Sequence, residues 1–222
     1  MQVLPPVHPR AILATYMEAI ILASASPRRR ELLDLLGIPF VLSPAGIDET
    51  PPPGMTPRQV AEHLARAKAL AVADSLPPSD SLLPSDSRTA GPDWVLAADT
   101  VAALDGETLG KPADRDEARA MLGRLAGREH SVVTAIALRN GRGGGIDARS
   151  AECGVRFAPL SPAEIEWYLD TGEWEGAAGG YRLQGKGACL VERVDGEPSA
   201  VEGLPLRAFY VMLRENGFRF GA

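Results

Sequence analysis

The sequence has few cysteines and no long apolar run, and these two absences exclude several classes of protein. Among its 222 residues are two cysteines, Cys153 and Cys189, which are too few for a disulfide framework and lack the spacing of a zinc site. We therefore expect a reducing, cytoplasmic environment. No run of apolar residues is long enough to cross a bilayer, so no membrane partner is expected. Residues 1–19 carry paired prolines and lack the apolar core of a signal peptide, which argues against secretion.

Positive charge is also in short supply. The chain has 23 lysines and arginines against 29 aspartates and glutamates, which gives a formal net charge of −6. A protein that coats nucleic acid would need the opposite balance, so no nucleic-acid partner is predicted. Apolar residues make up 45% of the chain, enough to build a full core in one large domain or two small ones.

The most informative stretch is residues 20–40, IILASASPRRRELLDLLGIPF. Its apolar start is typical of a buried strand, and small residues including Ser24 and Ser26 follow, where a ligand could approach the backbone closely. Ser26 then precedes a proline, the pattern of a helix N-cap and first turn. Arg28 and Arg29 lie at that helix N-terminus, where the helix dipole disfavours cations. An anionic ligand would reverse the penalty, so we predict a phosphate site here rather than a charged helix start held in solvent.

A single carboxylate interrupts the most apolar strand of the chain. Residues 94–104, WVLAADTVAAL, have the continuous apolar character of a buried strand apart from Asp99 and Thr100. A buried carboxylate is costly unless it is paired or binds a metal. Asp99 is thus the strongest candidate for chemistry, and the alternative is an aspartate satisfied by backbone amides at a strand end. The Asp-Gly pair that follows predicts a hairpin turn, which brings Lys111 near the mouth of the same sheet.

Acidic residues in a proline-rich loop form a second candidate. Asp48 and Glu49 follow a predicted strand and could bind a metal, although acids are equally ordinary in a loop. The next helix begins at Thr56, and its apolar stripe is expected to consist of Val60, Leu64, Ala67, Leu70 and Ala71. Lys68 is then placed off the centre of that stripe, from where it could reach a pocket.

A glycine-rich segment near the end of the chain is suited to holding a flat ring. Residues 171–187, TGEWEGAAGGYRLQGKG, combine flexible backbone with two aromatic side chains. Gln184 offers one acceptor and two donors, enough to pair with the imide face of a pyrimidine. The alternative is a flexible crossover without a ligand.

The remaining periodicities predict alternating strands and helices. Strands are expected at 20–22, 39–43, 94–104, 107–109, 130–138, 152–157 and 188–194, and helices at 27–36, from 57 onward, at 114–125, from 162 onward and at 204–213. Residues 77–92, rich in proline and serine, are predicted to be a surface insertion without chemistry. His130, at the start of a strand, could be a base or donate to a phosphate, but such a histidine is more often structural, which is the expectation here.

These motifs, taken in order, resemble the Maf family of nucleoside triphosphate pyrophosphatases. The resemblance rests on LASASPRR, DE, ADT, LGKP, GREHSVVTA, YRLQG and EGLPL, at 22–29, 48–49, 98–100, 109–112, 127–135, 181–185 and 202–206. It implies a single Maf-like pyrophosphatase domain over 20–218, preceded by an N-terminal extension at 1–19 and interrupted by the 77–92 insertion. The implied fold is α/β and Maf/ITPase-like, with an elongated mixed sheet flanked by helices and two lobes around a central cleft.

The resemblance also implies an activity: hydrolysis of a nucleoside triphosphate between the α- and β-phosphates, dependent on Mg²⁺ or Mn²⁺. Asp99 would be the general base, and with Glu49 it would surround the metal and the attacking water. The substrate would be bound by Ser24, Ser26, Arg28, Arg29, Lys68, Thr100, Lys111 and Gln184. The YRLQG form resembles the branch that acts on dTTP and UTP, which implies a housecleaning role in the nucleotide pool, extending to modified pyrimidine nucleotides.

The chain departs from the family at residues 176–179, where GAAG replaces the frequent DKAG and a lysine is lost. Two other functions stay open: a nucleotide-binding regulator of septum formation with little hydrolysis, and a nucleic-acid-binding module, which would need an extended basic face. The resemblance also suggests a homodimer. The sequence does not decide whether Met1 or Met17 is the natural start. Hydrolysis or binding of a nucleoside triphosphate requires Asp99 and Arg28 to face one cleft.

Overall fold

The computed structural model describes residues 17–76, 94–140 and 145–220. Within them, seven strands form one sheet in the order β2-β1-β3-β5-β6-β7, and β4 also pairs with β3. The strands are β1 (Ile20–Leu22), β2 (Phe40–Leu42), β3 (Trp94–Leu104), β4 (Glu107–Leu109), β5 (Glu129–Asn140), β6 (Ile146–Phe157) and β7 (Val191–Asp195). Strand β1 is parallel to β2 and β3, whereas the other pairs are antiparallel, so the sheet is mixed as predicted.

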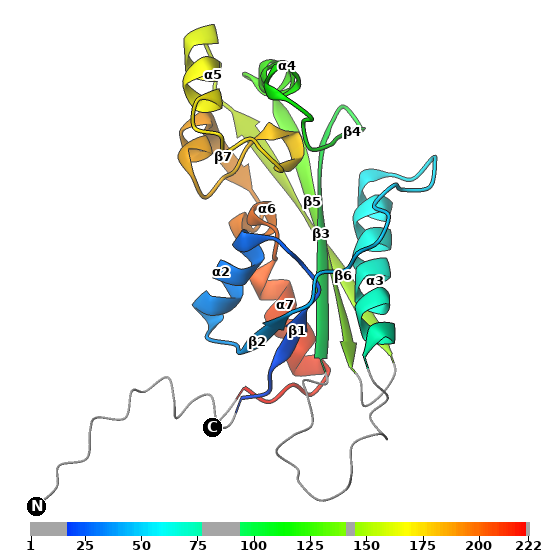
Figure 1. The fold of residues 1–222 in the computed structure, drawn as a ribbon. Helices are drawn as coiled ribbons and strands as arrows, with labels where there is room; N and C mark the ends of the chain where they lie inside the picture. The colour runs from blue at the N-terminus through cyan, green and yellow to red at the C-terminus, as the bar shows by residue number, and fades with distance from the viewer. Residues whose placement is uncertain (1–16, 77–93, 141–144, 221–222) are drawn as a thin grey trace, which may run out of the picture.

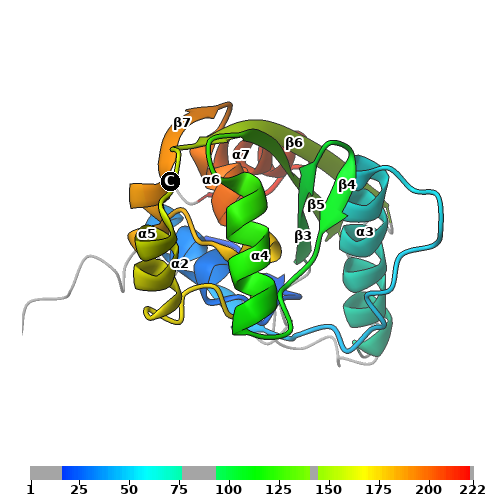
Figure 2. The same cartoon turned by 90° about the horizontal axis from the view of Figure 1, so that it is seen from above.

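Helices cover both faces of this sheet. They are α2 (Pro27–Leu36), α3 (Pro57–Ser75), α4 (Arg115–Leu125), α5 (Pro162–Leu169), α6 (Pro198–Glu202) and α7 (Leu206–Glu215), with short 3-10 turns η2 (Ala178–Gly180) and η3 (Lys186–Leu190). In Figure 1, α4, α5, β4 and β7 gather at one end of the long strands, and α2, β1, β2 and α7 gather at the other. Figure 2 shows α3 on the side of the sheet opposite to α2, α5 and α6.

Strand β3 separates the layers because its side chains alternate between the two faces. Val95, Ala97 and Val101 pack in one apolar cluster with the buried side of α3. Leu96 and Ala98, which point the other way, belong to the cluster that contains α2 and α7. A third cluster holds the α4 and α5 end together. Asp99 therefore projects toward α3, and its neighbour Thr100 projects toward α2.

The local signals for helix ends are confirmed in several places. Thr56 and Ser161 each form a capping box, with Gln59 and Glu164 respectively as the reciprocal partner. The hairpin predicted after β3 is present, and Asp105 adopts a left-handed φ of 54° in its turn.

Other expectations at this level are corrected. Helical spacing predicts that Leu32, Leu33, Leu35 and Leu36 all face inward, but Leu35 is 74% exposed and Leu36 is 36% exposed, so only Leu32 and Leu33 of the four are buried. Strands β5 and β6 are longer than predicted, because they pair along nearly their whole length. Residues 186–190 form η3 rather than the start of a strand, and the short helix α6 was not predicted.

Some predicted segments fall outside the described residues. These are most of the N-terminal extension at 1–19 and the 77–92 insertion. No helix in the described part of the chain is long and apolar enough to cross a membrane.

Candidate active site

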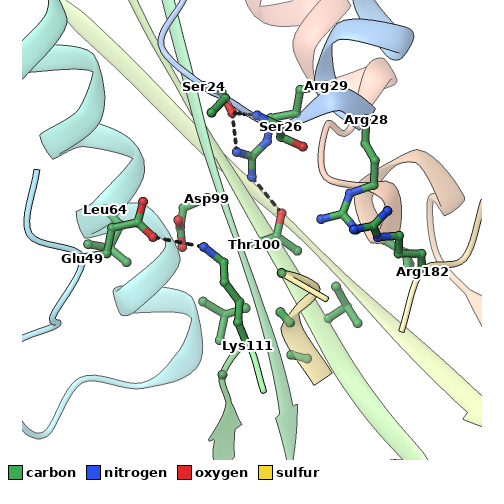
Figure 3. A pocket seen from close by; sticks show the side chains of 18 of the residues that line it. Ser24, Ser26, Arg28, Arg29, Glu49, Leu64, Asp99, Thr100, Lys111 and Arg182 are labelled. Atoms are coloured by element: carbon green, nitrogen blue, oxygen red, sulfur yellow. Dashed lines mark hydrogen bonds and ion pairs between the residues drawn. The ribbon is translucent and has the colours of Figure 1, made fainter. Parts of the chain in front are cut away.

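A cavity of about 810 Å³ opens beside strand β3. All ten residues predicted for the site line it: Ser24, Ser26, Arg28, Arg29, Glu49, Lys68, Asp99, Thr100, Lys111 and Gln184. The requirement that Asp99 and Arg28 share one cleft is thus met. Figure 3 shows the arrangement, with the acidic side chains near α3 and the arginines near α2.

The cavity exists because one edge of β3 is only partly covered. Along that edge β1 pairs with residues 94–96, and β4 pairs with residues 102–104. The stretch between them carries Asp99 and Thr100. Side chains from both faces of the sheet therefore reach the same opening, although they belong to different layers.

Asp99 is held by a lysine that reaches it from α3. Lys68 Nζ lies 2.7 Å from Asp99 Oδ1 and 2.9 Å from Glu49 Oε1, and Lys111 Nζ lies 3.5 Å from Glu49 Oε2. Lys68 and Asp99 are 6% and 7% exposed, whereas Glu49 is exposed. These four residues, Glu49, Lys68, Asp99 and Lys111, form what we call the acid–lysine group.

The expected position of Lys68 off the apolar stripe is wrong. The buried face of α3 consists of Val60, Ala61, Leu64, Ala65, Lys68, Ala69 and Val72. Lys68 lies one helical turn after Leu64, in the middle of that face, and Leu70 is 42% exposed. Helical periodicity treats a lysine as a polar, outward-facing residue, and this displaced the expected stripe from the buried face. Its pairing with Asp99 is what makes its burial tolerable.

Burial and neighbouring charge shift the pKa values of Asp99 and Glu49 in opposite directions. Burial raises the pKa of Asp99 above its usual value, and the charges of Lys68 and Arg29 reduce that rise without cancelling it. Partial burial also acts to raise the pKa of Glu49, but the hydrogen bond and charge of Lys68, with the charge of Lys111, outweigh it, so that pKa is lowered. Asp99 is therefore the stronger base of the two.

Arg29 is built into the wall of the cavity. Its Nε donates to the Gly203 carbonyl at 2.9 Å, its Nη1 to Ser24 Oγ at 2.9 Å and its Nη2 to Thr100 Oγ1 at 3.2 Å. Burial lowers the pKa of Arg29 to about 10. Arg29 thus fixes the loop after β1 against β3 and α6, in addition to bringing positive charge to the cavity.

The start of α2 is arranged as the sequence predicts, with one difference. Ser26 is the N-cap residue, but its hydroxyl makes no capping hydrogen bond among the described residues. Its backbone N–H donates instead to Ser24 Oγ at 3.2 Å. The first-turn amides of α2 are therefore not satisfied by their own cap, as an anion site at a helix N-terminus requires.

The segment that carries Gln184 wraps around a carboxylate. Gly187 N–H donates to Glu173 Oε2 at 3.4 Å, and a Cβ placed at Gly185 would overlap the same carboxylate. A Cβ at Gly187 would overlap the Arg182 carbonyl oxygen. Position 187 therefore requires glycine, because backbone lies in the way, whereas a side chain at 185 would displace the Glu173 carboxylate. The tight turn presents Gln184 at the cavity rim, where it is exposed.

Two earlier candidates lie elsewhere. Asp48 is exposed, and its Oδ1 accepts a hydrogen bond from Thr50 N–H at 2.9 Å outside the cavity lining. His130 is 3% exposed and packs against Phe157 and Tyr181, and its Nε2 lies 2.9 Å from Tyr181 Oη. Burial lowers the pKa of His130 to about 4, which fits its expected structural role.

The residues present are compatible with a divalent cation that is completed by substrate. Within the described ranges no three histidine, cysteine, aspartate or glutamate side chains converge as a complete metal site. Mg²⁺ commonly uses one or two carboxylates and takes its other ligands from phosphate and water. Glu49 and Asp99, brought together by Lys68, offer such a pair.

Sequence reasoning missed one cavity residue of note, Arg182. Its side chain lies beside that of Arg28 in Figure 3, and both residues line the cavity. The signal was present in the motif YRLQG at 181–185, from which only the glutamine was singled out.

Comparison with known proteins agrees with the motifs. The profile of the family described as Maf-like protein matches residues 19–216. A protein of Symbiobacterium thermophilum named dTTP/UTP pyrophosphatase is 44% identical over 202 residues, covering 91% of this chain and 96% of the relative. A protein of Myxococcus xanthus with the same name is 45% identical, covering 89% of this chain and 92% of the relative.

Among solved structures, that of the Staphylococcus aureus Ham1 protein is 14% identical with a TM-score of 0.40, covering 64% of this chain and 72% of that one. This is too distant to bear on the site. The family profile spans most of the chain and the named relatives are similar over nearly their full length. The chain belongs to the Maf-like protein family.

Proposed function

We propose that this protein is a nucleoside triphosphate pyrophosphatase that hydrolyses dTTP and UTP to the nucleoside monophosphate and pyrophosphate. The observation that carries the proposal is the acid–lysine group, which opens into the same cavity as the N-terminus of α2 and its arginines. A base for activating water and a cationic surface for phosphates are the two things that this reaction needs. The names of the curated relatives support the choice of substrates.

Asp99 is proposed as the general base. Its Oδ1 accepts the hydrogen bond from Lys68, which leaves Oδ2 to orient a water molecule and take its proton. Because burial raises the pKa of Asp99, the carboxylate is a stronger base than an exposed aspartate would be. Lys68 holds Asp99 in place, and its positive charge opposes the effect of burial on the pKa of that carboxylate.

A divalent cation, Mg²⁺ or Mn²⁺, belongs to the proposal. Glu49 and Asp99 would hold it together with the substrate phosphates. When bound, it would supply positive charge that offsets repulsion between the carboxylates and the triphosphate. Arg28, Lys68 and Lys111 supply further positive charge from the cavity wall.

Base selection is assigned to the rim of the cavity. Gln184 can present both a donor and an acceptor to the imide edge shared by thymine and uracil. The glycines around it allow the backbone to approach a flat ring closely. On this basis the pyrimidine triphosphates, including modified ones, are the proposed substrates, and the cellular role is housecleaning of the nucleotide pool.

The compartment, oligomeric state and partners of the protein are proposed from its composition and its family. We infer a cytoplasmic homodimer that acts on free nucleotides and on no nucleic acid. The net charge of −6 supports the absence of a nucleic-acid partner, and the two free cysteines support a reducing compartment, whereas the homodimer is inferred from the family alone. Light scattering of the purified protein tests the homodimer. Failure of the protein to bind duplex DNA at low salt tests the absence of a nucleic-acid partner.

The central experiment is a panel of standard and modified nucleoside triphosphates, assayed with Mg²⁺, with Mn²⁺ and with a chelator. Product pyrophosphate is detected after conversion to phosphate by an added inorganic pyrophosphatase. We expect dTTP and UTP to give the monophosphate and pyrophosphate, and the chelator to stop the reaction. Nucleotide binding without pyrophosphate release would favour the regulator of septum formation instead. Release of phosphate without the added pyrophosphatase would overturn cleavage at the α–β bond.

A further inference from the structure

We infer that Arg182 is a substrate-binding residue that, together with Arg28, holds the terminal phosphates of the nucleotide, which leave as pyrophosphate. This inference rests on the proposed function and adds to it a residue that the motifs did not single out. It is carried by the position of the two arginines, by their lack of acidic partners and by the way the fold anchors Arg182.

The two guanidinium groups come from distant parts of the chain to the same wall of the cavity. Arg28 lies in the first turn of α2, and Arg182 lies between η2 and η3. Both line the cavity, and Figure 3 shows their side chains next to each other on the side away from Glu49 and Asp99. The pair forms what we call the arginine end of the cavity.

Neither arginine has an acidic partner within ion-pair distance among the described residues. By contrast, Arg115, Arg119 and Arg149 each contact two carboxylates. The charges of Glu31 and Glu202 act on Arg28 only from beyond that distance. Burial lowers the pKa of Arg28, and the charge of Arg182 lowers it further. Two like charges on a partly buried wall repel each other, and an anion bound between them would turn that repulsion into attraction.

Arg182 is anchored rather than loose. Its backbone N–H donates to the hydroxyl of Tyr168, a fully buried side chain, at 3.1 Å. Its Nη2 donates to the Glu175 carbonyl at 2.7 Å, and its own carbonyl is closely covered by Gly187. Its Nε is buried and has no hydrogen-bond partner among the described residues. The guanidinium is thus held by its backbone and by one nitrogen, and its remaining donors are not all used by the protein; phosphate oxygens suit the planar fork of arginine.

The balance of charge at the two ends of the cavity decides which phosphates of the substrate lie at the arginine end. In the acid–lysine group the two carboxylates offset the two ammonium groups. The α-phosphate must lie there, because Asp99 has to direct water at it. The β- and γ-phosphates carry most of the negative charge and gain more when the bond breaks, so they are best placed at the arginine end, where no carboxylate is paired with the cations.

The test separates binding of the two products. The binding of inorganic pyrophosphate and of dTMP is measured by calorimetry in Mg²⁺, alongside the Michaelis constant for dTTP. In Arg182→Gln we expect pyrophosphate to bind at least about tenfold more weakly and the Michaelis constant to rise by a similar factor, since a charge-assisted contact is lost. The affinity for dTMP should stay unchanged. Arg182→Lys, which keeps the charge, should recover part of the loss.

Lys186→Gln is the matched control. Lys186 is an exposed cation four residues further along the same loop, and it does not line the cavity. It should leave both affinities unchanged. If Arg182→Gln does not fold, as judged by its unfolding midpoint, Arg182→Lys carries the same comparison of pyrophosphate against dTMP.

Equal weakening of pyrophosphate and dTMP would assign Arg182 a role in supporting the loop and overturn the inference, as would unchanged affinity for pyrophosphate. These results are distinct from a failure of the proposed function. If the wild-type protein does not release pyrophosphate from any triphosphate, the proposed function itself is wrong. An active wild type with an unaffected Arg182→Gln variant would remove only this inference.

Discussion

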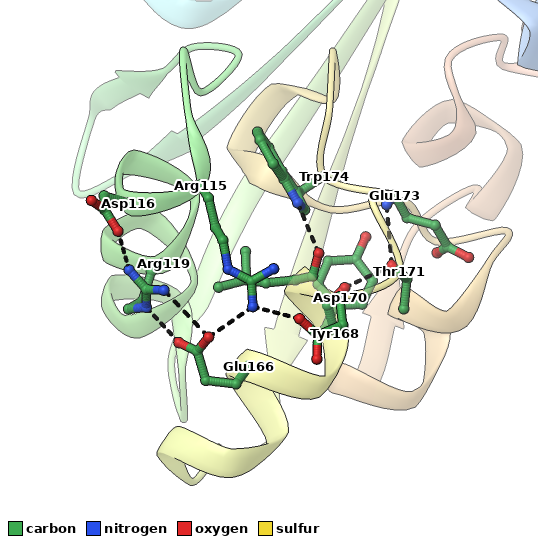
Figure 4. Close-up of polar contacts among 10 residues, drawn as sticks. Arg115, Asp116, Arg119, Glu166, Tyr168, Asp170, Thr171, Glu173 and Trp174 are labelled. Carbon is green, nitrogen blue, oxygen red and sulfur yellow. Dashed lines mark hydrogen bonds and ion pairs between the residues drawn. The ribbon is translucent and has the colours of Figure 1, made fainter.

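Two groups of ion pairs in this molecule use the same chemistry at different depths. The acid–lysine group lies beside β3, and a second group of Arg115, Arg119, Glu166 and Asp170 joins α4 to α5 (Figure 4). Their contact distances are alike, with 2.7 Å for Lys68–Asp99 and 2.8 Å for Arg115–Glu166. Their side-chain exposures are not: 8% and 10% for the first pair against 39% and 43% for the second.

That difference in burial reverses the direction in which the pKa of the paired carboxylate is shifted. The hydrogen bonds from Arg119 and Arg115 lower the pKa of Glu166 to about 2, because little desolvation opposes them. Burial raises the pKa of Asp99 although Lys68 is in direct contact with it. An exposed network fastens two helices at small energetic consequence, whereas a buried pair is costly to maintain and supplies a group of altered basicity. The cost of the buried pair is the physical reason for assigning it to the chemistry.

The largest effect is expected at the buried acid. Asp99→Asn removes the base while keeping the shape of the side chain, so kcat should fall by about a hundredfold or more and the protein should stay folded. The measurement is steady-state hydrolysis of dTTP together with a thermal unfolding curve. Asp105→Asn, in the exposed hairpin turn that ends the same strand, is the control and should keep wild-type turnover. Unchanged turnover in Asp99→Asn would remove that residue from the catalytic role.

Removing the buried cation should be the most damaging change to stability. Lys68→Met leaves Asp99 buried without its closest partner, which should cost about 3 kcal/mol of unfolding free energy at neutral pH. The pKa of Asp99, already raised by burial, should rise further. A carboxyl group whose pKa is raised in the folded state favours folding when protonated, so the lost stability should return as the pH falls through that pKa. Denaturant unfolding of wild type and variant from pH 7 downward measures this.

In the double variant Lys68→Met with Asp99→Asn, the loss should be smaller than the sum of the two single losses, because the uncompensated charge is gone. Additive losses would show that the two side chains do not act as a pair.

The adjacent arginines of α2 should separate binding from stability. Arg29→Met leaves the Gly203 carbonyl and the Thr100 hydroxyl without their Arg29 donor and removes one of the two donors to Ser24 Oγ, so it should lower the free energy of unfolding by about 2 kcal/mol as well as weaken substrate binding. Arg28→Met should change stability by less than about 0.5 kcal/mol, yet raise the Michaelis constant for dTTP about tenfold through a lost phosphate contact. Equal stability losses in the two variants would contradict the different roles given to these neighbours.

The smallest effect is expected in the exposed network. Glu166→Gln should leave hydrolysis unchanged and shift the unfolding midpoint by about 2 °C or less, since exposed pairs are screened by solvent. The pKa of Glu166 is depressed from about 4.5 to about 2, so its contribution is present above about pH 4.5 and lost as the pH falls toward 2. The difference in unfolding midpoint between wild type and variant should therefore vanish over that range. A difference that grows on acidification would contradict the assignment.

How far the sequence predicted the site depended on the kind of signal. Asp99 was found because a charge in an apolar strand is costly, and that argument holds in any fold with a buried strand there. Lys68 was named but placed wrongly, because periodicity treats every lysine as solvent-facing and its partner lies 31 positions along the chain. Arg182 was missed because its importance lies in facing Arg28, and the sequence contains no sign of that proximity.

The helices, strands and turns also divide into those set by local sequence and those set by distant contacts. The helix starts at 57 and 162 and the hairpin turn at Asp105 depend on neighbours within a few residues, and all three were predicted. The lengths of β5 and β6 and the small helix α6 were not, since they are set by pairing and packing with distant segments.

By itself, the sequence determined which short segments form strands, turns and capped helices, and which charged side chains are too costly to bury without a partner. Both depend on local backbone preference and on the desolvation of single groups. Only the tertiary structure decided that the edge of β3 stays open between β1 and β4, and that two lysines, two acids and three arginines from distant segments meet at that opening. The reason is that such meetings depend on the path of the whole chain, and the order of residues does not encode them at short range.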